Sequence, residues 1–224
     1  MLYEDYIMRT INLFFKMIFR ILKLRQEDYR EALQAIDELF KQLFGMGSRL
    51  FNTLPEEEIL KMLSSENGLQ PDKVLIAACL LQEEGMIYKE HLDAGESFGR
   101  LLKALNLMLT VLKDGHKIHL PRQYADPSEL IGQLESYHLP KDTLISLAEY
   151  YERTGRYAKA EDVLYEALGE EYGDPEEWRK RIREFYRRLM AKEDSELAKG
   201  NLPRNEITDA MLKLEKEGQD NHLS

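Results

Sequence analysis

Apolar side chains recur at helical spacing along almost the whole chain, and this period limits the possible folds more than any other feature. Strand-like alternation is confined to one short stretch, residues 117–120. The sequence therefore predicts an all-α protein. We expect helices at residues 3–25, 28–44, 56–64, 72–90, 94–113, 128–136, 141–153, 157–168, 176–193 and 204–217.

Proline follows an aspartate at two of the expected helix starts, in Asp126-Pro127 and in Asp174-Pro175. At the N-cap, an aspartate carboxylate accepts hydrogen bonds from backbone N–H groups that have no partner inside the helix. A proline at the next position lacks only an N–H that would have had no intrahelical acceptor. Both prolines therefore indicate helix starts and not helix breaks.

The longest join between expected helices, residues 114–126, has no helical period and is the candidate for a subdomain boundary. Because the other joins are short, we expect a single domain over residues 1–218. The apolar stripe ends after Glu215, which predicts a frayed tail at residues 219–224.

The composition is that of a globular protein with a sizeable core. Of the 224 residues, 43% are apolar and 32% are charged. The formal net charge of −10 disfavours attachment to nucleic acid or to an anionic membrane, so we expect a protein or peptide partner. Cys79 is the only cysteine, which excludes an intramolecular disulfide and a multi-cysteine metal site. A reducing, cytoplasmic location is therefore expected.

The helix expected near the start of the chain is long and apolar over most of its circumference. Its one clearly polar stripe recurs at spacings of seven, four and three residues and consists of Arg9, Lys16, Arg20 and Lys23. These charges leave no uncharged run long enough for a membrane span, and no signal-peptide cleavage site is present. The apolar surface needs a cover, which could be the following helices, a second copy of the chain or shallow contact with a membrane.

Between residues 141 and 174, small and large apolar residues alternate in a way that suits two closely packed helices. The residues concerned are Leu144, Leu147, Ala148, Tyr151, Gly155, Tyr157, Ala160, Leu164 and Ala167. This pattern resembles a tetratricopeptide repeat, in which two antiparallel helices form a unit of about 34 residues. Leucine stands where that family usually has tryptophan, and the closing proline, Pro175, comes slightly late.

Weaker copies of the same pattern occur at residues 78–111 and, in degenerate form, at residues 13–46. The resemblance implies antiparallel helical hairpins stacked as a right-handed superhelix, here with a long apolar N-terminal helix and extra C-terminal helices. The arrangement also resembles uncharacterised bacterial proteins with tetratricopeptide-like helices, a family of unknown function that implies no activity.

The resemblance further implies a concave groove lined by the first helix of each repeat. The matching positions in this chain are Gln82, Met86, Lys89, Ile145, Glu149 and Glu152. Family members that clamp the terminal carboxylate of a peptide use lysine, arginine and asparagine there, and the best repeat has none of these at the matching positions. Binding of such a peptide tail is therefore disfavoured. The alternative is that these residues form a solvated helix face or are covered by neighbouring helices.

Other chemistries have little support in the sequence. The arginine-rich helix expected at residues 176–193 has interleaved glutamates and an apolar seam, which is typical of a solvated helix and not of a nucleic-acid site. His116 and His119 are too few to hold zinc. The sequence has no phosphate-binding glycine loop, dinucleotide fingerprint or nucleophile elbow. We therefore expect no metal, no cofactor and no catalytic residues.

The interpretation that fits these features is a non-enzymatic helical-repeat protein that mediates protein–protein interaction. Its partner is a protein or peptide, or a second copy of the chain that pairs through the N-terminal helix. The alternative is an enzyme or small-ligand binder whose site is assembled from residues distant in sequence.

Overall fold

A computed structural model describes residues 2–66, 68–113, 115–169 and 173–220, with the backbone alone for residues 2–6 and 215–220. The described chain is almost entirely helical, which confirms the all-α prediction. It divides into two compact units, Met1–His138 and Leu139–Ser224. This division lies C-terminal to residues 114–126, the expected subdomain boundary. That the two units form a single domain stays a prediction.

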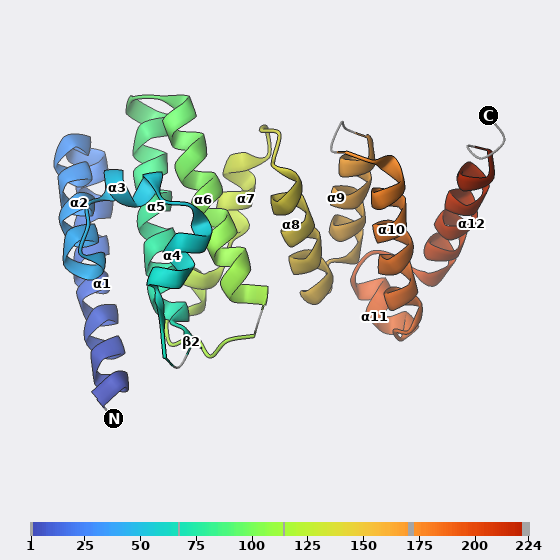
Figure 1. Cartoon of the computed structure of the whole chain (residues 1–224), viewed down its shortest axis with the longest axis horizontal. Helices are drawn as coiled ribbons and strands as arrows, with labels where there is room; N and C mark the ends of the chain where they lie inside the picture. The colour runs from blue at the N-terminus through green and yellow to red at the C-terminus, as the bar shows by residue number, and fades with distance from the viewer. Residues whose placement is uncertain (1, 67, 114, 170–172, 221–224) are drawn as a thin grey trace. The chain divides into compact units, whose positions relative to one another are not determined.

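Unit 1 contains the longest helices (Figure 1). Its elements are α1 (Leu2–Glu27), α2 (Tyr29–Phe44), α3 (Ser48–Thr53), α4 (Glu56–Met62), the short strands β1 (Ser64–Ser65) and β2 (Gly68–Leu69), α5 (Pro71–His91), α6 (Ala94–Lys113), the 3-10 turn η1 (Arg122–Ala125) and α7 (Ser128–Leu134). The two strands pair antiparallel, Ser64 with Leu69 and Ser65 with Gly68.

Unit 2 contains helices alone among its described residues. They are α8 (Lys141–Arg153), α9 (Tyr157–Gly169), α10 (Pro175–Met190), α11 (Asp194–Lys199) and α12 (Arg204–Asp220). Because α12 continues to Asp220, the expected tail is helical at residues 219 and 220, and its remainder lies outside the described residues.

The predicted long helices are confirmed, whereas the shortest elements were not predicted. α3 and α11 have six residues each, which is less than two helical turns and too short to show an apolar period. The β1–β2 hairpin was also missed. Residues 117–120, which alternate like a strand, form no strand.

α5 is the central helix of unit 1 and lies between the α1–α2 pair and α6 (Figure 1). Residues 74–81 are buried without interruption, so α5 has no solvent-facing side over two turns. α6 packs closely along it. Gly85 permits this approach, because a Cβ atom there would lie 2.9 Å from the side chain of Leu101.

α1 is amphipathic and packs against α2 and α5. The long apolar helix that was expected at the start of the chain is not found among the described residues. Its buried face is formed by Ile7, Ile11, Phe14, Ile18 and Ile21. Near its C-terminal end, the Arg25 guanidinium donates to Glu83 at 2.9 Å and to Glu90 at 2.5 Å, both on α5. None of the helices described has a stretch long and apolar enough to cross a membrane.

α8 and α9 form a helical hairpin in unit 2. Gly155 occupies the turn with φ 72°, a left-handed conformation that glycine adopts without steric cost. Ala148 and Ala160 are both buried, as expected for small residues at a close helix–helix contact. The sequence therefore located the hairpin correctly. The expected superhelix extends over both units, and its arrangement stays a prediction.

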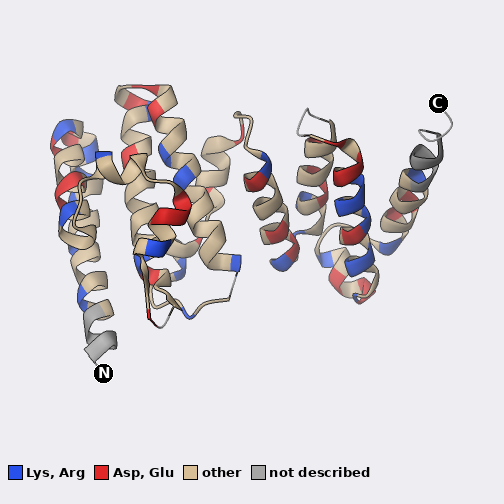
Figure 2. Cartoon of the chain, viewed as in Figure 1, with Lys and Arg blue, Asp and Glu red and all other residues tan. Residues whose placement is uncertain are grey.

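α10 presents a buried seam to the rest of unit 2, as the sequence predicted. The seam consists of Trp178, Ile182, Phe185 and Leu189. On its other faces, lysine and arginine alternate with glutamate (Figure 2). Arg179 pairs with Glu176 at 2.7 Å. Asp174 caps the helix and accepts a hydrogen bond from the Glu176 N–H, which confirms the predicted start.

We expect Ala160→Leu to lower the free energy of unfolding of unit 2 by about 1–3 kcal/mol, because the added carbons overfill the α8–α9 contact. Trp178 is the only tryptophan, so its fluorescence during urea unfolding reports on unit 2. Ala198→Leu, at an exposed position of α11, is the matched control and should change stability by less than about 0.5 kcal/mol. An unchanged midpoint for Ala160→Leu would contradict the close contact.

Cys79 provides a corresponding probe of unit 1. Burial raises the pKa of its thiol to about 12, and the thiol donates to the Tyr124 carbonyl at 3.6 Å. Because the folded pKa lies above that of a free cysteine, stability should fall as the pH rises above about 8.5.

At pH 8 we expect an aromatic disulfide reagent to modify the native thiol at least about 100-fold more slowly than the urea-unfolded thiol. Equal rates would contradict its burial.

Candidate functional site

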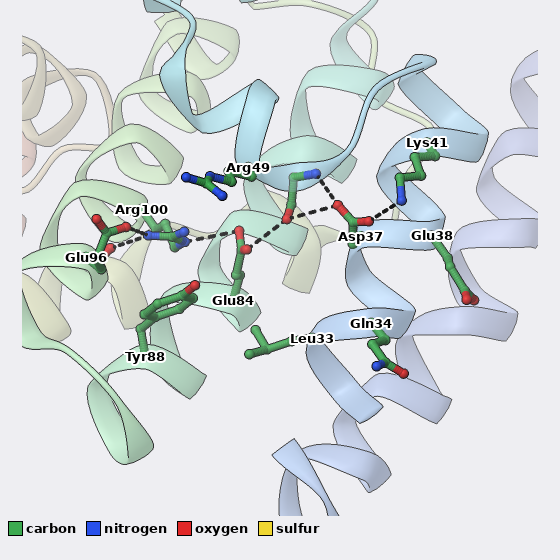
Figure 3. Close-up of a pocket in the computed structure, with 11 residues that line it drawn as sticks. Leu33, Gln34, Asp37, Glu38, Lys41, Arg49, Glu84, Tyr88, Glu96 and Arg100 are labelled. Atoms are coloured by element: carbon green, nitrogen blue, oxygen red, sulfur yellow. Dashed lines mark hydrogen bonds and ion pairs between the residues drawn. The ribbon is translucent and has the colours of Figure 1, made fainter. Parts of the chain in front are cut away.

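A hollow of about 660 Å³ lies in unit 1, bordered by residues of α2, α3, α5 and α6 (Figure 3). Most of the side chains around it are polar or charged. The side chains that form its floor are Asp37, Ser48, Glu84, Tyr88 and Arg100. These residues lie far apart in the sequence and come from four helices.

Glu84 of α5 is the most buried carboxylate in the floor. One of its oxygens accepts a hydrogen bond from the Ser48 hydroxyl at 2.9 Å. The other accepts from the Asn52 amide at 2.9 Å. It also lies 3.2 Å from Nε of Arg100 (Figure 3). This carboxylate therefore connects α5 to α3 and to α6.

Arg100 of α6 is also buried, and its charge is compensated on several sides. Its guanidinium donates to the Glu96 carboxylate at 2.5 Å and lies 3.9 Å from the centre of the Tyr88 ring. Burial lowers the pKa of Arg100, but the nearby Glu84 and Glu96 carboxylates raise it by more, so the net shift is upward. The arginine is therefore held in its charged form.

Asp37 of α2 is the second carboxylate of the floor. It accepts the Ser48 N–H at 2.8 Å and the Lys41 ammonium at 2.6 Å. The hydrogen bond from Lys41 lowers the pKa of Asp37 despite its partial burial. Both floor carboxylates thus have partners within the protein, and together they fix the start of α3. At the rim, Arg49 is exposed and forms no ion pair with any residue that the structure describes.

The groove positions that the sequence predicted on α5 face α7. Gln82 donates to Glu129 at 3.0 Å, and Lys89 donates to Gln133 at 2.8 Å. Met86 lies between them along α5 and is buried. Gln82 is half-buried and Lys89 is exposed, so a groove at these positions stays a prediction.

The remaining groove positions lie on α8, in unit 2. Glu152 accepts two hydrogen bonds from the Arg188 guanidinium, at 2.7 and 2.8 Å. Ile145 and Glu149 are half-buried. The two triplets belong to different units, and a groove formed by all six residues stays a prediction.

An aspartate–histidine pair in unit 1 was not predicted. The buried Asp72 carboxylate accepts the backbone N–H groups of His119 and Leu120 at 2.8 and 2.9 Å, and it lies 2.7 Å from Nδ1 of His119. These contacts fasten the segment before η1 to the start of α5. Within the described ranges, no group of three histidine, cysteine or acidic side chains could hold a metal ion.

α1 carries a second apolar row in addition to its buried face, and we call this row the outer seam. It consists of Met8, Asn12, Phe15, Phe19 and Leu22. Met8, Phe19 and Leu22 are 49%, 67% and 38% exposed. Phe15 is half-buried, with its ring 5.4 Å from that of Tyr124. The outer seam is therefore a solvent-facing strip of large apolar side chains with one asparagine.

A row of cations runs beside the outer seam, and we call it the basic row. Its members are the exposed residues Arg9, Lys16, Arg20 and Lys23, each one position after an apolar residue of the seam. Successive residues of a helix are about 100° apart around its axis, so the two rows run side by side along α1. The sequence had identified the basic row but could not separate the outer seam from the buried face.

We expect Arg100→Met to destabilise unit 1 by about 3–5 kcal/mol, because it leaves the Glu84 carboxylate buried without its counter-charge. Glu84→Leu should have a similar effect, and the double variant should lose less than the sum of the two. Urea unfolding followed by circular dichroism and by Cys79 modification measures these changes. Lys41→Ala removes an exposed pair on the same hollow and should have little effect. Additive losses would contradict the proposed coupling.

Comparison with known proteins identifies a family. The sequence model of a family of unknown function, DUF6483, matches residues 1–219. No curated protein and no solved structure matches the chain. Because the match extends over nearly all of the chain, the protein belongs to the DUF6483 family of unknown function.

Proposed function

We propose that this protein is a non-enzymatic helical protein that binds another protein through the outer seam of α1. The observation that carries the proposal is the exposure of Phe19, 67%, in a row with Met8 and Leu22. Large apolar side chains that gather on one strip of a surface are typical of interaction sites, whereas single exposed ones need no explanation. The same helix is anchored to α5 by its buried face and by Arg25, so the strip is presented on a fixed support.

The hollow of unit 1 supports a structural role better than catalysis. General acid–base or nucleophilic chemistry needs a titratable group that is positioned toward a substrate and available to it. The carboxylates of Glu84 and Asp37 are engaged by Ser48, Arg100 and Lys41. Their contacts join four helices, which explains why buried charge is present there.

The helical hairpin of unit 2 supports a resemblance to the tetratricopeptide repeat. Supporting features are the glycine turn at Gly155 and the buried alanines Ala148 and Ala160 at the α8–α9 contact. We further propose that the helical hairpins stack as in that superfamily and so form a rigid scaffold. A single thiol and no disulfide fit a cytoplasmic location.

A small-ligand binder is the second candidate, and the size of the hollow favours it. Its volume of about 660 Å³ lies within the range of about 300–1,000 Å³ that is usual for ligand pockets. Arg49 at its rim could pair with an anionic ligand. This candidate involves α2, α3, α5 and α6, and it predicts no contact between α1 and another protein.

Site-specific photo-cross-linking tests the proposed function. We expect benzoylphenylalanine in place of Phe19 to form adducts with another protein when the full chain is irradiated in cells of its source organism. The same amino acid in place of Leu50, which is 55% exposed on α3, is the matched control and should form few adducts. Equal yields at the two positions, or adducts from Leu50 alone, would contradict a binding role for the outer seam.

A further inference from the structure

The outer seam has the spacing of one side of a helix pair. Its positions, from Met8 to Leu22, are separated by four, three, four and three residues. This is the spacing at which two helices interlock side chains in a coiled coil. The exposed sector is also narrow, because the neighbouring apolar sector of α1, from Ile7 to Ile21, is buried in unit 1. A single helix is therefore the occupant whose shape fits the seam.

The basic row indicates which charge the docked helix must have. Residues that flank the seam of a coiled coil form ion pairs with the partner helix and select which partner binds. Lys16 and Arg20 form no ion pair with any side chain that the structure describes, and Lys23 pairs only with the exposed Glu27 at 3.6 Å. The row therefore presents positive charge that a helix with flanking carboxylates would complement.

A second copy of this chain would not complement the charge of the basic row if the two copies paired through their α1 helices. In an antiparallel pair of α1 helices, the two basic rows would lie against each other and repel. In a parallel pair, Arg9, Lys16 and Lys23 would face the positions of Glu4, Ile11 and Ile18 on the other copy, so that Arg9 alone would meet an acidic residue. Neither arrangement supplies a carboxylate from α1 of the other copy to Lys16 or Lys23.

A membrane surface also fits poorly. Helices that lie in a membrane interface bury a broad apolar face, whereas the exposed strip of α1 is narrow and has Asn12 within it. The net charge of −10 on the whole chain opposes its approach to an anionic bilayer.

We therefore propose that the occupant of the outer seam is an acidic amphipathic helix of another protein, with apolar residues at coiled-coil spacing and aspartate or glutamate beside them. The basic row then selects this partner by charge, and the seam supplies the apolar contact. This inference rests on the proposed function and specifies the class of partner that it requires.

Two synthetic peptides serve as probes for the full chain. Both are about three heptads long with leucine at the seam positions; the acidic probe has glutamate beside the leucines, and the basic probe has lysine there. By fluorescence anisotropy at low salt, we expect the acidic probe to bind at least about tenfold more tightly than the basic probe. Lys16→Glu combined with Lys23→Glu should reverse this order, because these two residues flank the seam at positions that face the partner helix.

Matched variants separate the seam from the rest of the surface. Phe19→Ser combined with Leu22→Ser should weaken binding of the acidic probe at least about tenfold, because it removes the apolar contact. Leu50→Ser, which removes a similarly exposed apolar side chain from α3, should leave it unchanged. Both substitutions are at exposed positions, and circular dichroism verifies that each variant is folded.

The outcomes distinguish the inference from the proposed function. If the two probes bound with equal affinity and the seam variant bound neither, the inference of an acidic partner would be overturned. The seam would still be a helix-binding surface. No binding of either probe, with no adducts from position 19, would overturn both. A dimer in light scattering that the seam variant abolishes would assign the seam to a second copy. Flotation with phosphatidylcholine–phosphatidylserine vesicles, lost on charge reversal, would assign it to a membrane. Either of these results would overturn the inference.

Discussion

The burial of α5 on all sides over residues 74–81 is the constraint on which the rest of unit 1 depends. A helix without a solvent-facing side must satisfy each of its polar side chains inside the protein, or the desolvation cost destabilises the fold. Three carboxylates of α5 have partners of this kind. Asp72 holds the segment before η1, Glu83 accepts Arg25 of α1, and Glu84 joins α3 to α6. These three carboxylates thus have hydrogen-bonding partners inside the protein and at the same time position the neighbouring segments.

This arrangement connects the core of unit 1 with its outer surface. α1 is held along one side by apolar packing against α2 and α5, and near its C-terminal end by the ion pairs of Arg25. Burial raises the pKa of Glu83, while Arg25 opposes that rise and favours the charged carboxylate. The outer seam therefore belongs to a helix with fixed orientation, which suits a surface that a partner must recognise by both shape and charge.

Much of the fold could be predicted from the sequence, because the long helices have a clear apolar period. The helices expected at residues 94–113 and 141–153 coincide with α6 and α8. Short elements carry too few residues to reveal a period, which explains the missed α3 and α11. The contacts of the hollow could not be predicted, because Ser48 and Glu84 are 36 residues apart and no local pattern relates them.

The surfaces were harder to predict for a related reason. Two apolar rows with helical spacing lie on α1, and periodicity alone cannot tell which of them faces the core. On α5, the repeat pattern predicted that Gln82 and Lys89 line a groove, but it gave no sign of their hydrogen bonds to Glu129 and Gln133 of α7. Which helix covers which face is decided by packing between segments that are distant in sequence.

Asn12 gives the outer seam a further property. For a helix docked there, only one lengthwise alignment places a polar side chain opposite the Asn12 amide. A partner displaced by one heptad would enclose that amide among apolar groups, at a cost of about 1–3 kcal/mol for the lost hydrogen bonds. A single asparagine therefore allows the surface to distinguish sliding positions of the same partner, so that the complex would form in one register.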